Sequence, residues 1–491
     1  MHSYSEFTKE LQKQTNYCTT ENGAITLKSS LDDCVDFFYA TLDSKEDYYK
    51  KFRKALSQNR EVALKTLFWH RDIRQNGMGR RANFRHVLTK VDDWKEEYDF
   101  SLEALYHYGR SDDALSLMDT KMGKEVLKLI KRVLKPSSKN EFDENLLPST
   151  PSAALIAKWL PRESSKKEGY RFLARRIARF LGWSSKEYRK KISALTNVVE
   201  QQMVSGKWNE INFSHVPSQA SLRYKNCFLQ NANENYRKWQ ISLTEGSEAK
   251  VNTTTLSPHQ IIDKYGCMYI REEDRTLEAM WRAIPKIESN CLVVADTSGS
   301  MCGTPMAVSL ALALYFAERN PYKGFITFSS EPTWHTINPE DTLQDKLESI
   351  KSINIQNTNL QATFDLLLET YESTQMMPET ILIVSDMQFD QAIGHNDHKD
   401  EYTYRRHSFI DKTSFFKKMK KRFESLGVPF PSIVFWNVKE STTGCPVSFD
   451  ETGTALISGY NPSVMQSVMN CEELNPRTIM LEAISNINPT L

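Results

Sequence analysis

The spacing of apolar positions changes near residue 286 of this 491-residue chain. Before that point, apolar residues recur every three to four positions between short polar breaks, a spacing that predicts α-helices over residues 1–240. After it, short apolar runs alternate with helical periodicity, which is typical of strands buried on both faces of a parallel sheet. The pattern therefore predicts a multidomain chain with an all-α region over 1–240, a connector over 241–285 and a doubly wound α/β domain over 286–491.

Five short apolar runs form the predicted sheet, with a helix between most consecutive strands. Strands joined in this way are expected to be parallel, and segment 333–337 is predicted to add an antiparallel edge strand. The predicted strands are 291–295, 324–328, 381–385, 432–436 and 455–458, and the predicted helices are 305–319, 360–373, 409–426 and 473–486.

Composition fits a soluble protein of a reducing compartment. Hydrophobic residues make up 40% of the chain and charged residues 25%, as in ordinary globular proteins. No apolar run is long enough to cross a membrane, and the N-terminus lacks the basic and apolar regions of a signal peptide. The eight cysteines are scattered without zinc-binding spacing. We therefore expect a cytoplasmic protein with no membrane partner.

Charge is unevenly distributed along the chain. Residues 1–250 carry 43 Lys and Arg against 32 Asp and Glu, whereas residues 251–491 carry 20 against 30. Segment 51–90 has 11 basic and 2 acidic residues, and segment 151–200 has 12 and 4. Such clusters indicate a polyanion as the partner. The alternatives are attraction between the two halves and an ordinary solvated helix face. The predicted contacts to such a polyanion, which the family resemblance described below implies to be RNA, are Arg71, Arg74, Arg80, Arg81, Arg85, Arg171, Arg175, Arg176, Arg179, Arg189 and Lys190.

Two adjacent helices carry the second of these clusters. One is predicted to begin after Ser184, because Glu187 three residues later completes a capping box. The helix before it carries arginines at four-residue spacing, which places them in one stripe. Phe172 and Phe180 are expected to lie away from this stripe and to pack. The arginines of the stripe are Arg171, Arg175 and Arg179.

Oxygen-bearing side chains follow the predicted strands of the α/β domain. Asp296, Ser298 and Ser300 form the pattern Asp-x-Ser-x-Ser after the first strand, Thr358 precedes a helix, and Asp386 follows a later strand. These side chains can converge, because the carboxyl ends of parallel strands meet at one edge of a sheet. Oxygen ligands with few carboxylates suit a hard divalent cation such as Mg²⁺. Helix capping and an empty, purely structural site are the alternatives.

This order of ligands resembles the von Willebrand factor type A domain and its metal-ion-dependent adhesion site. In that family the Asp-x-Ser-x-Ser motif, a Thr and a second Asp hold one divalent cation, and a partner's carboxylate often completes the shell. The resemblance implies that the α/β domain binds a protein partner through the metal. Met387 departs from the pattern, since many such domains have Gly there. The implied metal ligands are Asp296, Ser298, Ser300, Thr358 and Asp386.

Further motifs extend the resemblance over most of residues 50–480. They are similar to an uncharacterised family, found in viruses, fungi and plants, that pairs a helical region with an adhesion-type domain. The layout is also similar to that of the Ro autoantigen, or TROVE, family. That resemblance implies HEAT-like helical repeats that close into a ring and hold small structured or misfolded RNA as a ribonucleoprotein. Trp69 and Phe84 offer rings for base stacking, although core packing is the favoured interpretation. The motifs lie at 70–74, 157–163, 186–190, 216–220, 304–306, 327–329, 357–361, 385–390, 435–438 and 456–460.

The sequence carries little that indicates catalysis. Cys302 follows the metal loop without a His to activate it, and three histidines in a polar insertion lack metal-binding spacing. No phosphate-binding Gly-rich loop is present, so we predict that the chain is not an enzyme. Two hypotheses follow: a Ro-like RNA-binding protein with an Mg²⁺-dependent adhesion site, or a metal-dependent protein-interaction scaffold without RNA binding. The three histidines are His395, His398 and His407.

Overall fold

The chain folds into two compact units. The sheet unit comprises Met1–Ala63 and Ser257–Ser485, and the helical unit comprises Leu64–Leu256 and Asn486–Leu491. An α-helical region and an α/β region are therefore both present, as the apolar pattern predicts. The computed structural model describes residues 2–90, 100–134, 153–196, 198–243, 249–253, 256–265, 274–287, 289–328, 331–350, 359–389, 414–440 and 444–490.

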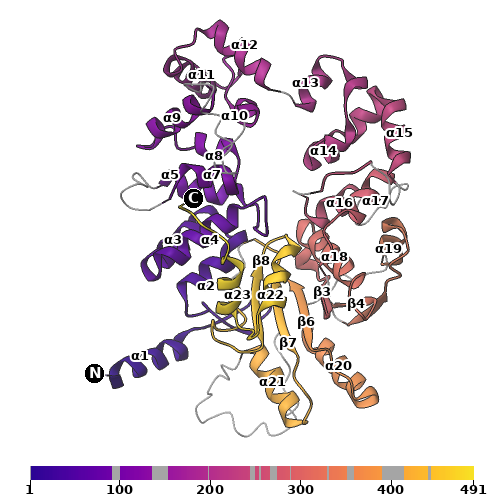
Figure 1. Ribbon diagram of the computed structural model, residues 1–491. Coiled ribbons are helices and arrows are strands. Elements are labelled where there is room, and N and C mark those ends of the chain that lie inside the picture. Colours follow the sequence, from indigo (N-terminus) through magenta and orange to yellow (C-terminus); the bar gives the residue numbers. More distant parts are fainter. Residues whose placement is uncertain are drawn as a thin grey trace. The chain divides into compact units, whose positions relative to one another are not determined.

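Six strands form the centre of the sheet unit, in the order β5-β4-β3-β6-β7-β8 (Figure 1). All neighbours pair in parallel except β5, which runs antiparallel to β4 at the edge. Every residue of β3 and β4 is buried, so these apolar runs are strands covered on both faces. The predicted strands are confirmed to within one residue at each end. They are β3 (Cys291–Asp296), β4 (Gly324–Phe328), β5 (Thr333–Thr336), β6 (Thr380–Ser385), β7 (Ser432–Asn437) and β8 (Thr454–Ser458).

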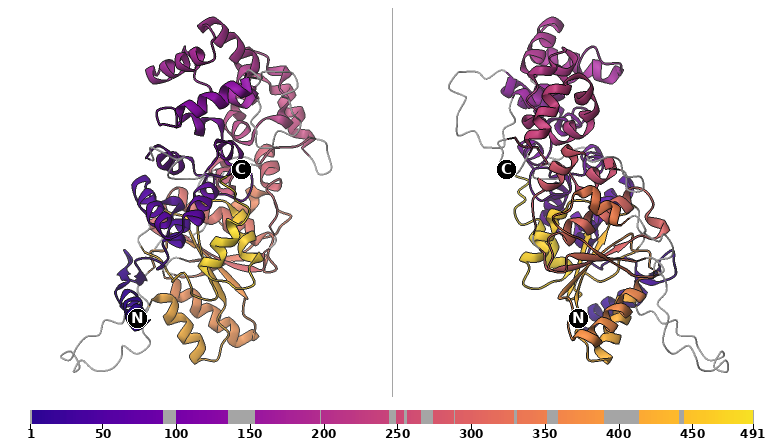
Figure 2. Two further views of the ribbon diagram at one scale, coloured as in Figure 1. Left: turned by 60° about the vertical axis from the view of Figure 1, so that its left-hand side comes forward. Right: turned by 90° about the vertical axis from the view of Figure 1, so that its right-hand side faces the viewer.

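Helices cover both faces of this sheet (Figure 2). The most buried of them is α18, which packs against β3, β4 and β6 and exposes little apart from its first turn. The predicted helices are confirmed with shifted ends, and α19 is an addition to them. The elements that follow the first strand are η5 (Gly299–Met301), α18 (Thr304–Ala317), α19 (Leu343–Ser349), α20 (Leu360–Thr374), α21 (Phe415–Ser425), η6 (Pro462–Val464), α22 (Met465–Asn470) and α23 (Pro476–Ala483).

The first 63 residues belong to the sheet unit rather than to the helical region, contrary to the predicted range 1–240. They contain a short hairpin that pairs with a distant loop: the backbone N of Leu27 donates to the Cys445 carbonyl at 3.0 Å, and Cys445 N donates back at 2.7 Å. Local periodicity carries no signal for a contact between residues more than 400 positions apart. The elements are α1 (His2–Thr15), β1 (Tyr17–Thr19), β2 (Ile25–Leu27), α2 (Asp33–Phe38), η1 (Tyr39–Leu42) and α3 (Lys45–Gln58).

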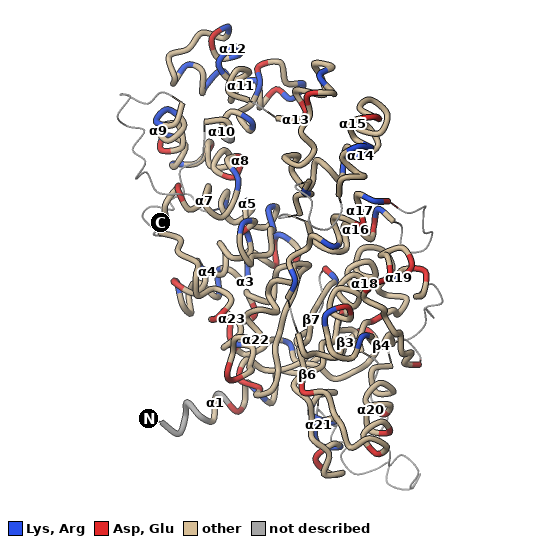
Figure 3. Tube along the Cα trace, turned by 45° about the vertical axis from the view of Figure 1, so that its right-hand side comes forward, with Lys and Arg blue, Asp and Glu red and all other residues tan. Residues whose placement is uncertain are grey.

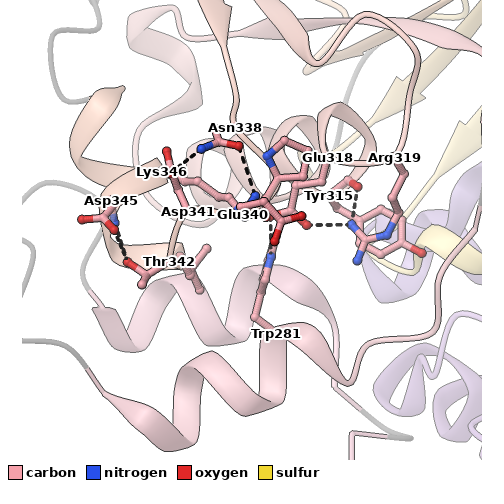
Figure 4. Close-up of polar contacts among 12 residues, drawn as sticks. Trp281, Tyr315, Glu318, Arg319, Asn338, Glu340, Asp341, Thr342, Asp345 and Lys346 are labelled. Atoms are coloured by element: carbon pink, nitrogen blue, oxygen red, sulfur yellow. Dashed lines mark hydrogen bonds and ion pairs between the residues drawn. The ribbon is translucent and has the colours of Figure 1, made fainter. Parts of the chain in front are cut away.

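Much of the predicted connector also packs within the sheet unit. It forms α16 (Pro258–Tyr265) and α17 (Arg275–Arg282), and α16 contacts α18. Trp281 Nε1 donates to Glu318 Oε1 at 2.8 Å, and Lys346 Nζ lies 3.0 Å from the same oxygen (Figure 4). Glu318 and Lys346 are both largely buried. Because each charge has a partner, the cluster joins α17, α18 and α19 without an unpaired buried charge.

The helical unit contains no strand among its described residues. The predicted capping box is confirmed, because Ser184 and Glu187 exchange hydrogen bonds at the start of α12. HEAT-like repetition of these helices and closure into a ring stay predictions. No described helix of the chain is long and apolar enough to span a bilayer. The elements are α4 (Arg60–Arg71), α5 (Arg81–Lys90), α7 (Leu102–Tyr108), α8 (Ser111–Leu115), α9 (Gly123–Leu134), α10 (Ala153–Trp159), α11 (Glu168–Phe180), α12 (Ser185–Leu195), α13 (Val199–Val204), η3 (Trp208–Glu210), η4 (Phe213–His215), α14 (Ser218–Asn231) and α15 (Asn233–Ser242).

Candidate functional site

The Asp-x-Ser-x-Ser loop lies at the carboxyl edge of the sheet, where β3 and β6 run side by side. Asp296 ends β3 and is fully buried. Its Oδ1 accepts a hydrogen bond from the backbone N of Ser298 at 2.9 Å, and its Oδ2 accepts one from the Ser385 hydroxyl at 2.5 Å. The hydroxyl oxygens of Ser298 and Ser300 lie 3.1 Å apart. The loop therefore gathers a buried carboxylate and two hydroxyls, with Ser300 exposed at its rim.

A second buried carboxylate, that of Asp386, follows β6 at the same edge. Its Oδ1 accepts a hydrogen bond from the backbone N of Gln388 at 3.1 Å, and its Oδ2 lies 3.0 Å from Lys439 Nζ. Burial, together with the nearby charge of Asp386, raises the pKa of Asp296 to about 7. Of these two buried carboxylates, Asp386 pairs with an ammonium group, whereas Asp296 accepts hydrogen bonds from Ser298 and Ser385. Such an oxygen-rich site with excess negative charge fits a divalent cation.

Hydroxyl groups are necessary members of this donor set. Within the described part of the chain, no three His, Cys, Asp or Glu side chains gather where they could hold a metal ion. Among the described residues, the groups that could hold a cation at this edge are the carboxylates of Asp296 and Asp386 and the hydroxyls of Ser298 and Ser300. Several predicted residues lie outside the described residues, namely the proposed ligand Thr358 and the histidines His395, His398 and His407.

The loop after β6 bends at Met387. This residue has a φ of +62°, in the left-handed region that favours Gly. Its side chain is nevertheless buried, with 4% exposed. Met387 therefore adopts a backbone conformation that favours Gly, the residue that many von Willebrand factor type A domains have at the corresponding position.

The first basic cluster, which comprises Arg71, Arg74, Arg80, Arg81 and Arg85, is only partly available to a ligand. Arg71 is 2% exposed, and its Nε and Nη2 each lie 2.8 Å from Asp113 Oδ2. Arg85 lies 2.6 Å from both Asp112 and Asp113. The prediction that Arg71 contacts RNA is wrong, because a buried, paired guanidinium cannot reach a phosphate. Arg85 is engaged in the same ion-pair network.

The other residues of this region divide between surface and core. Arg74 and Arg81 are exposed and Arg80 is half-buried, and Arg81 lies 4.0 Å from Asp112. Trp69 and Phe84 are 2% and 0% exposed, so the core interpretation of these rings is confirmed. The first basic cluster therefore offers fewer free charges than its sequence suggests.

The second basic cluster, on α11 and α12, comprises Arg171, Arg175, Arg176, Arg179, Arg189 and Lys190. The two helices contact each other, and Lys and Arg follow one another along both (Figure 3). Arg176 pairs with the exposed Asp119 at 3.3 Å, and Arg171 donates to the backbone carbonyl of Ser165. The remaining four are exposed and form no ion pair with another described residue: Arg175, Arg179, Arg189 and Lys190.

Sequence reasoning assigned the aromatic residues of α11 incorrectly. Phe172 is 65% exposed and Phe180 is 38% exposed, although both were expected to pack. The buried stripe of α11 instead consists of small and aliphatic residues, so the helix is turned with Phe172 outward. Lys439 beside Asp386, and the aspartates Asp112 and Asp113, could not be predicted from local sequence, because each of their contacts joins distant segments. The buried stripe comprises Ala174, Ile177 and Ala178, followed by Leu181.

Comparisons with known proteins match most of the chain and attach no activity to it. Residues 134–288 match a domain of unknown function, DUF2828, and residues 290–486 match another, DUF7788. The uncharacterized protein L728 of Acanthamoeba polyphaga mimivirus is 28% identical over 522 residues, covering 96% of this chain and 87% of that protein. The Ro (RSR) protein of Deinococcus radiodurans is 12% identical, with 92% of this chain and 94% of that chain covered and a TM-score of 0.37. A TM-score of 0.37 does not establish a common fold.

Proposed function

We propose that the chain is an RNA-binding protein that holds RNA on its helical unit and binds a protein partner through Mg²⁺ on its sheet unit. The second basic cluster carries this proposal, because its exposed arginines have no acidic partner among the described residues. Guanidinium groups pair bidentately with phosphates and stack on bases, which suits them to RNA. The proposed ligands are small structured or misfolded RNAs with single-stranded ends. Closure of the helices into a Ro-like ring would extend this proposal and rests on the sequence resemblance.

Fluorescence anisotropy of a labelled RNA hairpin with a single-stranded tail tests the RNA proposal. The full chain is titrated at several salt concentrations, and the slope of log K against log salt is measured. The double variant R175Q/R179Q should lower this slope by about 1.4, since each phosphate contact to a single strand contributes about 0.7. The matched control R223Q/R237Q removes two exposed arginines from α14 and α15 and should leave the slope unchanged. Equal effects of both variants, or no binding at low salt, would contradict the proposal.

The metal proposal rests on the donor set at the carboxyl edge of the sheet. Asp296 and Asp386 supply the charge, and the hydroxyls of Ser298 and Ser300 supply neutral oxygens. When bound, Mg²⁺ would supply a coordination position for a partner's carboxylate. The ammonium group of Lys439 forms an ion pair with Asp386 Oδ2, so it competes with the cation for that oxygen.

Calorimetric titration of the full chain with Mg²⁺ tests this site. S300A should weaken Mg²⁺ binding without unfolding the protein, because Ser300 is exposed. K439Q should tighten Mg²⁺ binding, because it removes the competing charge. A purely structural site would show neither change, and an absence of Mg²⁺ binding by the wild-type chain would contradict the proposal.

The alternative function, a metal-dependent protein-interaction scaffold without RNA binding, has the same metal site in its favour. The two functions differ in the anisotropy experiment. Under the RNA proposal, chelation of Mg²⁺ by EDTA leaves the RNA affinity unchanged, because the basic residues lie on a different unit from the metal site. If Mg²⁺ binds and RNA does not, the scaffold function is the correct one.

A further inference from the structure

Helix α11 presents Phe172 to solvent on the face that carries its arginines, and it exposes Phe172 more than its other aromatic residues Tyr170 and Phe180, which are 52% and 38% exposed. Phe172 is 65% exposed, whereas the residues on the opposite side of the helix are buried. At 3.6 residues per turn, positions i, i+3, i+4 and i+7 share a face. Glu168 stands at i−4 on the N-terminal side of Phe172, and three arginines at these spacings lie on its C-terminal side. They are Arg175, Arg176 and Arg179.

Packing within the described structure does not account for the position of Phe172. The ring makes no aromatic contact with another described residue, and α11 already buries a complete apolar stripe on its other side. Exposed aromatic side chains ringed by basic residues are a feature of surfaces that bind single-stranded nucleic acids, where bases stack on the rings and phosphates meet the charges. Charged residues stand at i−4, i+3, i+4 and i+7 from Phe172, so its face lacks the contiguous apolar area that a protein partner or a membrane would cover.

We propose that Phe172 is a stacking surface for an unpaired base of RNA, with Arg175 and Arg179 contacting the adjoining phosphates. This inference rests on the proposed RNA-binding function and specifies its ligand as the single-stranded part of the RNA. Stacking is sequence-tolerant, because every base has a π face. The site therefore selects unpaired RNA over duplex RNA rather than one sequence over another.

The energetic contributions of the ring and of the arginines differ in their response to salt. Phosphate contacts release counterions and so set the slope of log K against log salt, whereas base stacking does not. F172A should weaken binding about tenfold or more at every salt concentration without changing the slope. R175Q/R179Q should reduce the slope instead.

The experiment uses the full chain, a labelled 12-nucleotide oligouridine and the same strand with abasic sites in place of its bases. We expect F172A and F172L to lose affinity for oligouridine alike, F172W to retain it, and the wild-type chain to bind the abasic strand as weakly as F172A does. I241A removes another exposed apolar side chain of the helical unit, 61% exposed in α15, and should have no effect. Circular dichroism of each variant verifies that α11 remains folded.

Four other outcomes would contradict either the stacking role of Phe172 or the proposed RNA binding. If the wild-type chain binds oligouridine and F172A binds it equally well, the inference fails while the proposed function stands. If F172L retains the affinity that F172A loses, the ring acts as an apolar contact and stacking is excluded. If F172A leaves RNA binding unchanged but abolishes binding to anionic phosphatidylserine vesicles, the surface is a membrane site. If no RNA binds at low salt, the proposed function itself fails.

Discussion

The two basic clusters of the helical unit look alike in sequence and differ in the folded chain. In the first, Arg71 and Arg85 converge on Asp112 and Asp113, and the best-paired guanidinium is buried. In the second, Arg175, Arg179 and their neighbours on α12 face solvent without acidic partners among the described residues. The difference arises because Asp112 and Asp113 pair with the first cluster, although Asp113 lies 42 positions after Arg71 and 28 after Arg85. Clustered arginines therefore predict positive charge, and only their partners show whether that charge stabilises the fold or remains free for a ligand.

The largest expected effect comes from removing the shared acid of the first cluster. D113N leaves the buried Arg71 without its counter-charge, and breaking a buried pair by removing one partner costs about 3–5 kcal/mol. Urea unfolding is monitored by hydrogen exchange of peptides from α4 and α8, which reports the stability of the helical unit separately from that of the sheet unit. The conservative control D119N changes an exposed aspartate beside the second cluster and should leave stability within about 0.5 kcal/mol of wild type. A loss below about 1 kcal/mol for D113N would contradict the structural role of the cluster.

A smaller loss of stability is expected from R85Q. Arg85 is 26% exposed at its side chain and donates to two carboxylates, so its hydrogen bonds to charged partners are worth about 1–3 kcal/mol in total. The same exchange experiment measures the loss, and anisotropy measures RNA binding at a temperature where the variant is folded. We expect the RNA affinity of R85Q to equal that of the wild type, which would show that Arg85 does not contact RNA. Weakened RNA binding by a fully folded R85Q protein would show that the first cluster also binds RNA.

The exposed arginines of the first cluster allow the two clusters to be compared with variants that lose the same number of charges. R74Q/R81Q removes two charges, as R175Q/R179Q does, but Arg81 already lies 4.0 Å from Asp112. We expect R74Q/R81Q to reduce the salt dependence of RNA binding by less than about 0.7, one phosphate contact, against about 1.4 for R175Q/R179Q. A larger reduction of the slope by R74Q/R81Q than by R175Q/R179Q would indicate that RNA binds at the loop before α5 rather than on α11 and α12.

The smallest effect is an increase in affinity. Asp119 pairs with Arg176 at 3.3 Å on the surface, where such pairs contribute little to stability. D119N should strengthen RNA binding by about twofold, because it removes a negative charge that repels phosphate and leaves Arg176 bonded only to the neutral carbonyl of Met118. The same substitution in an R176Q background should have a smaller effect. A weaker affinity for D119N would indicate that Asp119 itself contacts the ligand.

The sheet was predictable because its strands are local apolar runs that are buried on both faces, and each run ends within one residue of the predicted position. Asp296, Ser298 and Asp386 were predictable for the same reason, since parallel strands deliver their carboxyl ends to one edge. The place of residues 1–63 was not predictable, because the pairing of Leu27 with Cys445 leaves no mark in local periodicity. Phe172 was misassigned because the arginine stripe was used to orient α11, whereas the small residues of the helix define its buried side.

Cross-linking of RNA to the chain tests the central claim, that the RNA lies on α11 and α12, most directly. The full chain is irradiated with a single-stranded RNA containing 4-thiouridine, and the cross-linked tryptic peptides are identified by mass spectrometry. Cross-links in peptides from Glu168–Leu195, lost in R175Q/R179Q but retained in R74Q/R81Q, are the predicted result. Cross-links confined to residues 71–85 or to the sheet unit would contradict the account.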